Sequence, residues 1–209
     1  MKRVAFLSAF LVLPLACRAE MTIVLDITGP GTANVPLGDA VAGWQFTINQ
    51  PITASALGLW DEDADGLDVT HTVGLWTSGG TLLGTAAVNN ASIPVASAFA
   101  GGRWLFTEIA PIILFPGTYV LGATWGNPID GADPFIVSAP LTTSGVSYDG
   151  GRVKTNLPDS SLVFPDLGPG AGGFFGPNLA VPVPEPAAFL LLGGAALWIG
   201  LSRVRRGRI

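Results

Sequence analysis

Three aspartates at alternate positions, followed by a glycine, are the residues whose spacing is best suited to chemistry in this sequence. Asp61, Asp63 and Asp65 directly precede Gly66. Carboxylates at positions 1, 3 and 5 with glycine at position 6 are typical of the start of a calcium-binding loop, because alternate side chains of a turning chain can converge on one hard cation. Ca²⁺ is therefore the one cofactor that the sequence indicates.

The second half of such a loop is incomplete in this chain. Position 7 is Leu67, which offers only its carbonyl, and position 12 is Thr72 instead of a bidentate glutamate. Glu62 and Asp68 could supply a further carboxylate, but no helices are expected on either side, so the segment is not an EF-hand. The alternative, which we favour, is a solvated acidic turn whose Asp and Gly residues serve turn geometry. The candidate calcium ligands are Asp61, Asp63, Asp65 and Asp68.

Other catalytic motifs are missing from the sequence. His71 is the only histidine, and no serine lies in a Gly-x-Ser-x-Gly elbow. No glycine-rich phosphate-binding loop occurs, and paired carboxylates on one short loop do not resemble glycosidase groups held across a cleft. We therefore expect no enzymatic activity, and we expect His71 to be a structural residue at the end of the acidic loop.

Five tryptophans lie between the two ends of the chain, and they allow two interpretations. Aromatic side chains on the surface of a β-sandwich can stack on sugars, and Trp60 and Trp76 lie near the acidic loop. Large aromatic residues more often fill the space between two sheets, which is the interpretation we favour. The tryptophans are Trp44, Trp60, Trp76, Trp104 and Trp125.

The segments that must position these residues alternate between apolar and polar side chains, as strands do. Glycine and proline turns separate them, and residues 78–80 (Ser-Gly-Gly) predict a hairpin. This pattern predicts an all-β fold, an antiparallel β-sandwich of jelly-roll or immunoglobulin-like type, with an up-and-down barrel as the alternative. Strands are expected at residues 22–28, 44–48, 53–60, 70–77, 81–88, 103–109 and 118–125, with a short apolar piece at 112–115 before a turn. Weaker strands are expected at 135–137, 145–148, 162–164 and 178–183, the last as an edge strand.

Charge is distributed unevenly along the chain. Residues 20–184 contain three of the ten basic residues and fourteen of the fifteen acidic residues, a net charge of −11 against −5 for the whole chain. Such an acidic region repels phosphate groups, so no nucleic acid partner is expected.

The first 19 residues have the pattern of a secretory signal peptide. Lys2 and Arg3 precede an apolar run over residues 4–16, and cleavage after Ala19 would place Cys17 and Ala19 at positions −3 and −1. A lipoprotein with Cys17 acylated is the weaker alternative. The expected partners of this segment are the Sec translocon and signal peptidase.

The last 27 residues, 183–209, have three adjacent parts. Val183, Pro184, Glu185 and Pro186 form a stiff tetrapeptide, because each proline fixes its own φ angle. Residues 187–201 are uncharged and apolar, which predicts a short transmembrane helix. Residues 202–209 form a basic tail that favours the cytoplasmic side of a membrane. Its arginines are Arg203, Arg205, Arg206 and Arg208.

This C-terminal order resembles the PEP-CTERM sorting signal of Gram-negative bacteria. The resemblance implies processing near the Pro-Glu-Pro by an exosortase, a membrane-embedded enzyme. The central region is similar to an uncharacterised β-sandwich domain of bacterial surface proteins, a family that implies an exported fold and no known reaction. The residues carrying this second likeness are 57–61, 65–67, His71, 73–76, 80–83 and 116–120.

Together these features predict a signal peptide (1–19), a β-sandwich domain (20–182) and a sorting signal (183–209). The expected function is that of an exported structural protein, transiently anchored by its C-terminal helix and then placed at the cell surface or in the extracellular matrix. The resemblance implies an association with exopolysaccharide or biofilm. The alternative is a calcium-dependent module for carbohydrate binding or adhesion.

Overall fold

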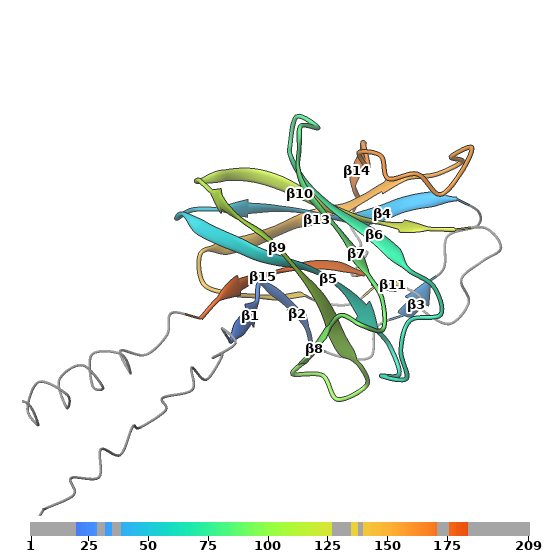
Figure 1. Ribbon diagram of the computed structural model, residues 1–209. Coiled ribbons are helices and arrows are strands. Elements are labelled where there is room, and N and C mark those ends of the chain that lie inside the picture. The colour runs from blue at the N-terminus through green and yellow to red at the C-terminus, as the bar shows by residue number, and fades with distance from the viewer. Residues whose placement is uncertain are drawn as a thin grey trace, which may run out of the picture. The chain divides into compact units, whose positions relative to one another are not determined.

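The structure, a computed structural model, describes residues 20–28, 32–34, 39–126, 135–137, 140–170 and 176–183, and the regular elements among them are all β-strands (Figure 1). Residues Met21–Val183 form one compact unit. Within the described ranges, no helix is long and apolar enough to cross a membrane. The expected signal peptide, the expected transmembrane helix and the basic tail lie outside the described residues.

One layer of the fold is a five-stranded antiparallel sheet. Its central strand β5 pairs with β9 on one side and with the C-terminal strand β15 on the other. The alternating sequence of residues 53–60 therefore lies in the middle of a sheet, where both neighbours satisfy its backbone. The strand order is β1 (Met21–Ile23), β15 (Pro177–Pro182), β5 (Ile52–Asp61), β9 (Arg103–Leu114) and β8 (Ile93–Ala96).

The other layer is a six-stranded antiparallel sheet around β4 and β10. Two further strand pairs, β11 with β3 and β12 with β2, complete the described strands. The six-stranded order is β14 (Leu167–Gly170), β13 (Val146–Lys154), β4 (Ala40–Ile48), β10 (Gly117–Trp125), β6 (His71–Thr77) and β7 (Leu82–Val88). The small pairs are β11 (Phe135–Val137), β3 (Thr32–Asn34), β12 (Pro140–Thr142) and β2 (Leu25–Ile27).

The hydrophobic core lies between the two layers and contains four fully buried tryptophans, Trp44, Trp60, Trp104 and Trp125. Trp44 lies on β4 of one sheet, and its indole Nε1 donates a hydrogen bond of 2.7 Å to the carbonyl of Pro177 on β15 of the other. The interpretation of the tryptophans as core residues is confirmed for these four. A sugar-stacking platform of Trp60 and Trp76 is wrong, because these side chains are only 1% and 3% exposed.

Trp76 is buried on the outer face of the six-stranded sheet instead of between the layers. Three glycines, Gly43, Gly122 and Gly74, lie side by side on β4, β10 and β6. A Cβ atom on Gly74 would meet the Trp76 ring at 2.4 Å, so the indole lies directly on this glycine row. Phe164 packs edge-on against Trp76 with ring centroids 6.1 Å apart, and its segment thereby covers the indole.

The structure confirms an all-β, antiparallel, sandwich-like fold and corrects four predicted elements. Residues 178–183 were expected at an edge, but β15 lies between β1 and β5, where both of its edges are paired. Residues 162–164 form no strand, because Phe164 packs across the sheet face. Residues 89–102, expected as a connection, contain β8, and residues 22–28 are divided between β1 and β2.

The strand registers define two ends of the sandwich. At the exit end, Met21 pairs with Pro182, and the β4–β5 and β9–β10 connections at residues 49–51 and 115–116 pass between the sheets. At the acidic end, Asp61 pairs with Arg103, and the loop of residues 62–70 leads from β5 to β6. The chain therefore enters and leaves the domain at the end opposite the acidic loop.

Candidate functional site

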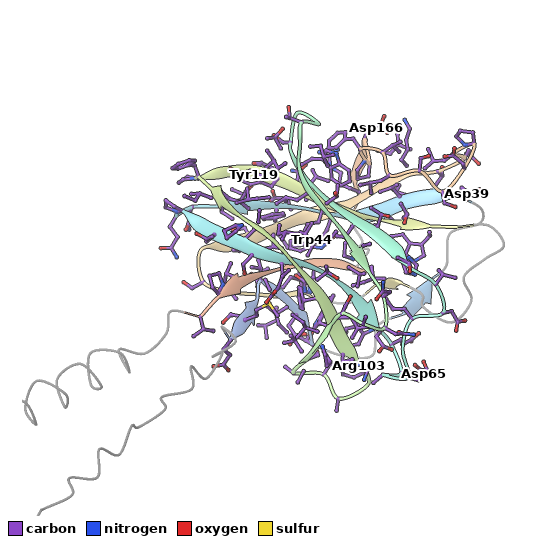
Figure 2. The ribbon with its side chains drawn as sticks, viewed as in Figure 1. Asp39, Trp44, Asp65, Arg103, Tyr119 and Asp166 are labelled. Atoms are coloured by element: carbon purple, nitrogen blue, oxygen red, sulfur yellow. The ribbon has the colours of Figure 1, made fainter. Side chains whose placement is uncertain are left out.

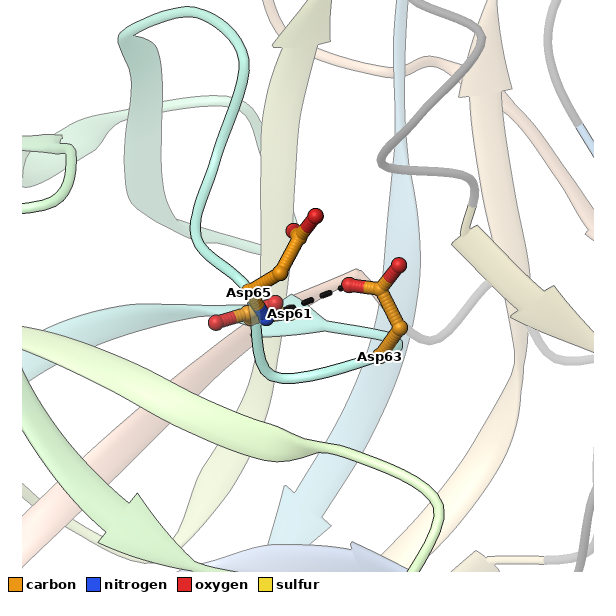
Figure 3. Close-up of side chains that lie close together, drawn as sticks. All are labelled: Asp61, Asp63 and Asp65. Carbon is orange, nitrogen blue, oxygen red and sulfur yellow. Dashed lines mark hydrogen bonds between the residues drawn. The ribbon is translucent and has the colours of Figure 1, made fainter.

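The candidate site is the acidic loop between β5 and β6. One carboxylate oxygen from each of Asp61, Asp63 and Asp65 lies within 4.8 Å of the other two. Figure 3 shows the three side chains. Asp61 is the last residue of β5 and is buried, whereas Asp63 and Asp65 lie on the exposed part of the loop. The spacing predicted from the sequence therefore brings three of the four proposed ligands together.

The backbone of the loop turns sharply at two residues with positive φ angles. Ala64 has φ of 63° and Gly66 has φ of 118°, a conformation that residues with a Cβ rarely adopt. Between them, the Asp65 amide donates to Asp63 Oδ1 at 3.2 Å, and the Gly66 amide donates to Asp61 Oδ1 at 3.4 Å. These short-range bonds are those of aspartate-stabilised turns, so the loop holds its shape with its own side chains.

A second loop clamps the acidic loop through Asn90. The side-chain Oδ1 of Asn90 accepts a hydrogen bond of 2.6 Å from the Leu67 amide, and its Nδ2 donates one of 3.0 Å to the Leu67 carbonyl. The carbonyl expected as a ligand at position 7 is thus already engaged. Thr72, at position 12, lies on β6 and donates its amide to Thr124 Oγ1.

Asp61 forms an ion pair with Arg103 that was not predicted from the sequence. The guanidinium Nε of Arg103 donates to Asp61 Oδ2 at 2.7 Å, and the Asp61 side chain is 0% exposed. The two residues are direct partners in the β5–β9 register. Arg103 therefore already supplies a positive charge to the buried carboxylate of the cluster.

The exposed carboxylates repel one another. The pKa of Asp65 is raised from its ordinary value of 3.8, first by a side-chain hydrogen bond to Asp63 and then by the charge of Asp63. The pKa of Glu62 is raised by burial and by the same Asp63 charge. A bound cation would relieve this repulsion, and so would a proton.

We expect Asp65→Asn to raise the melting temperature at pH 7. Because the folded-state pKa of Asp65 is raised, its favourable contribution is present at low pH and is lost as pH rises through the folded pKa. The difference in melting temperature between the variant and the wild type should therefore be largest at neutral pH and vanish in acid. It should also shrink in high salt. A constant difference at all pH values would contradict this electrostatic account.

Asp68 does not belong to the cluster that the three other aspartates form. Its charge still contributes to the raised pKa of Asp65. The arrangement thus offers one buried and two exposed carboxylates to a hard cation, fewer protein ligands than the six to eight oxygens that calcium takes.

His71 is buried and hydrogen-bonded to a neighbouring strand, as expected of a structural residue. Its ring is 1% exposed, and Nδ1 lies 2.6 Å from the carbonyl oxygen of Thr124 on β10. The ring also packs against Trp125 with centroids 5.8 Å apart. His71 thereby holds the start of β6, where the acidic loop ends, against the neighbouring strand.

The sorting residues predicted from the sequence fall mostly outside the described part of the chain. Val183 directly follows β15, while Pro184, Glu185, Pro186 and the four arginines lie outside the described residues. Comparison with family models, with curated proteins and with solved structures finds no match. Any function must therefore be argued from the residues and their geometry.

Proposed function

We propose that this chain is an exported structural protein that is retained at the membrane by its C-terminal segment and then placed at the cell surface or in the extracellular matrix. The observation that carries the proposal is the order of three parts at the C-terminus, from Val183 to the arginines. The position of β15 supports it, because the last strand ends at Pro182, one residue before the Val-Pro-Glu-Pro segment begins. The last described strand therefore ends where the sorting segment begins.

The proposed export pathway follows from the cost of moving charged side chains across a membrane. The N-terminal signal peptide (1–19) directs the chain to the Sec translocon, and signal peptidase removes it. Residues 187–201 then stop translocation, since the arginines after them remain in the cytoplasm. About 15 residues at ~1.5 Å each span only ~22 Å of a ~30 Å hydrocarbon core, so this helix is a weak anchor. Residues 183–186 lie at the outer boundary, within reach of an exosortase-like enzyme.

In the surface role, the acidic β-sandwich is a building block or an exopolysaccharide-associated protein, and it needs no catalytic group. Its net charge of −11 disfavours binding to nucleic acids and to other polyanions.

The test is the fate of the C-terminal tail in the native host. We expect Glu185→Ala, and separately glutamine at the four arginine positions, to leave an unprocessed form in the membrane fraction. Glu108→Ala, which changes an exposed glutamate on β9, is the matched control and should be processed normally. Intact-mass measurement of the recovered protein reports both cleavage sites and any group attached to the new C-terminus. Normal processing of both tail variants would refute the sorting role.

A second candidate, a calcium-dependent adhesion module, is favoured by the convergence of Asp61, Asp63 and Asp65. With so few protein ligands, the expected affinity is that of extracellular modules, a Kd on the order of 0.1–1 mM. Isothermal calorimetry should show calcium binding that Asp63→Ala abolishes. Glycan binding with and without calcium would then separate adhesion from a purely structural role. Absence of heat in millimolar calcium would exclude this candidate.

A further inference from the structure

The hairpin that joins β9 to β10 is unusually apolar for so acidic a domain. Residues 109–117, Ile-Ala-Pro-Ile-Ile-Leu-Phe-Pro-Gly, contain no polar side chain. Only Leu114 among them is buried, and Ile113 and Phe115 are 62% and 64% exposed. Ala110, Pro111 and Pro116 are exposed as well. We call residues 109–117 the apolar hairpin. Exposed apolar segments of this kind mark contact with a partner or a membrane.

The apolar hairpin lies at the exit end of the domain. Leu114 pairs with Ile52 at the start of β5, while Met21 pairs with Pro182 at the outer edge of the same sheet (Figure 1). No charged side chain occurs in the connection before β5, residues 49–51, or at the end of β15 and the residue after it, residues 180–183. These two segments therefore add no charge to the surface where the chain leaves the fold.

The charged groups gather toward the opposite end. Figure 2 shows Tyr119 at one side of the domain and Asp39 and Asp65 toward the other. Three exposed carboxylate residues, Glu20, Glu108 and Asp149, also lie in the half of the fold that contains the hairpin. The Asp149 carboxylate accepts hydrogen bonds from Thr47 Oγ1 and Gln45 Nε2 on the outer sheet face. The domain is therefore polarised along its strands, with its acidic loop remote from the hairpin.

We propose that the apolar hairpin is a membrane contact that rests in the lipid interface. The inference depends on the proposed retention of the chain by its tail. After Val183 only three residues separate the domain from the uncharged run 187–201, so a retained tail holds the exit end at the bilayer surface. Exposed Ile113 and Phe115 then enter the boundary between headgroups and acyl chains.

Two features favour lipid over a second copy of this chain as the occupant. The acidic loop lies at the far end, where it avoids the negative potential of anionic lipids. Tyr119, at the base of the hairpin, donates its hydroxyl to the Phe115 carbonyl at 2.9 Å, which fixes the exposed tip. A tyrosine with an apolar ring and a polar end is a side chain typical of the membrane interface.

The test measures how deeply the hairpin tip enters lipid in the full chain. Phe115→Cys is made with Cys17→Ser, labelled with a polarity-sensitive fluorophore, and reconstituted in vesicles of phosphatidylethanolamine and phosphatidylglycerol. Val69→Cys is the matched control, because Val69 is also an exposed apolar residue, at 50%, but belongs to the acidic loop. We expect nitroxide-bearing lipids to quench the label at position 115 several-fold more than the label at position 69.

Each other outcome overturns the inference. Equal quenching at both positions, in a chain that remains on the vesicles, overturns the membrane contact and leaves the sorting proposal intact. A label at position 115 that is shielded from water-soluble quenchers but not reached by lipid nitroxides, and that becomes exposed on dilution, identifies a second copy as the occupant. A full chain that does not stay on the vesicles overturns both the membrane contact and retention by the tail.

Discussion

Replacing Trp44 by alanine is expected to lower the free energy of unfolding of the domain by about 3–5 kcal/mol, the range found for large-to-small changes of aromatic core residues. The Trp44 side chain is fully buried and packs against Phe46, with ring centroids 4.9 Å apart. Its removal leaves a large cavity between the two sheets. The cavity cannot close, because β4 is held by paired strands on both of its sides. Urea denaturation followed by circular dichroism measures the loss.

The conservative variant Trp44→Phe separates packing from the hydrogen bond between the sheets. Phenylalanine keeps an aromatic ring but cannot donate to the Pro177 carbonyl, so we expect a smaller loss of about 1–3 kcal/mol. Leu82→Ala, at an apolar residue that is 50% exposed, is the control and should change stability little. If Trp44→Ala cost no more than Leu82→Ala, the assignment of Trp44 to the centre of the core would be wrong.

Trp44 also shows how far the sequence predicts the fold. The alternation of residues 44–48 placed its side chain on the buried face, because strand residues alternate between faces. Its partner Pro177 lies 133 positions away and follows a glycine-rich stretch without periodicity. No local pattern determines which neighbours a strand takes, so β15 was expected at an edge and is found inside a sheet, paired on both of its edges. Pairing between distant segments is set by the packing of the whole sandwich.

The candidate site, too, could be predicted from the sequence only in part. The spacing of Asp61, Asp63 and Asp65 was sufficient to predict that their carboxylates converge. Arg103 and Asn90 could not be predicted as their partners, since one depends on the β5–β9 register and the other on a loop 23 residues away from Leu67. The local sequence thus predicts which side chains could bind a cation. The groups that already occupy these side chains and the loop carbonyl come from distant parts of the chain.

Removal of the Arg103 guanidinium is the second change expected to have a large effect. Arg103→Met should lower the free energy of unfolding by about 2–4 kcal/mol, because it leaves the carboxylate of Asp61 buried without its positive partner. The double variant Asp61→Asn with Arg103→Met should lose less than Arg103→Met alone, since no buried charge then remains unpaired. Chemical denaturation of the two variants measures this difference, and equal losses would show that the charge of Asp61 is unimportant.

Lys154→Met provides a control with the same change of charge. Its ammonium pairs with Asp166 at 2.6 Å, but the two side chains are 38% and 48% exposed. Exposed ion pairs contribute little because water already screens them, so the expected loss is at most about 1 kcal/mol. A loss as large as that of Arg103→Met would mean that net charge, and not burial of Asp61, determines stability.

The Arg103→Met variant also distinguishes the two interpretations of the acidic loop. Arg103 occupies Asp61 Oδ2 with a fixed positive charge, and a cation bound by Asp61, Asp63 and Asp65 must share that carboxylate. If the loop binds calcium, millimolar calcium should restore part of the stability lost in Arg103→Met and should stabilise the wild type less, because binding to the folded state raises its stability by mass action. Magnesium, which requires a tighter octahedral shell, should restore less. A variant whose melting temperature does not respond to calcium would identify the loop as a turn held by Arg103 and Asn90, in which the aspartates serve the backbone alone.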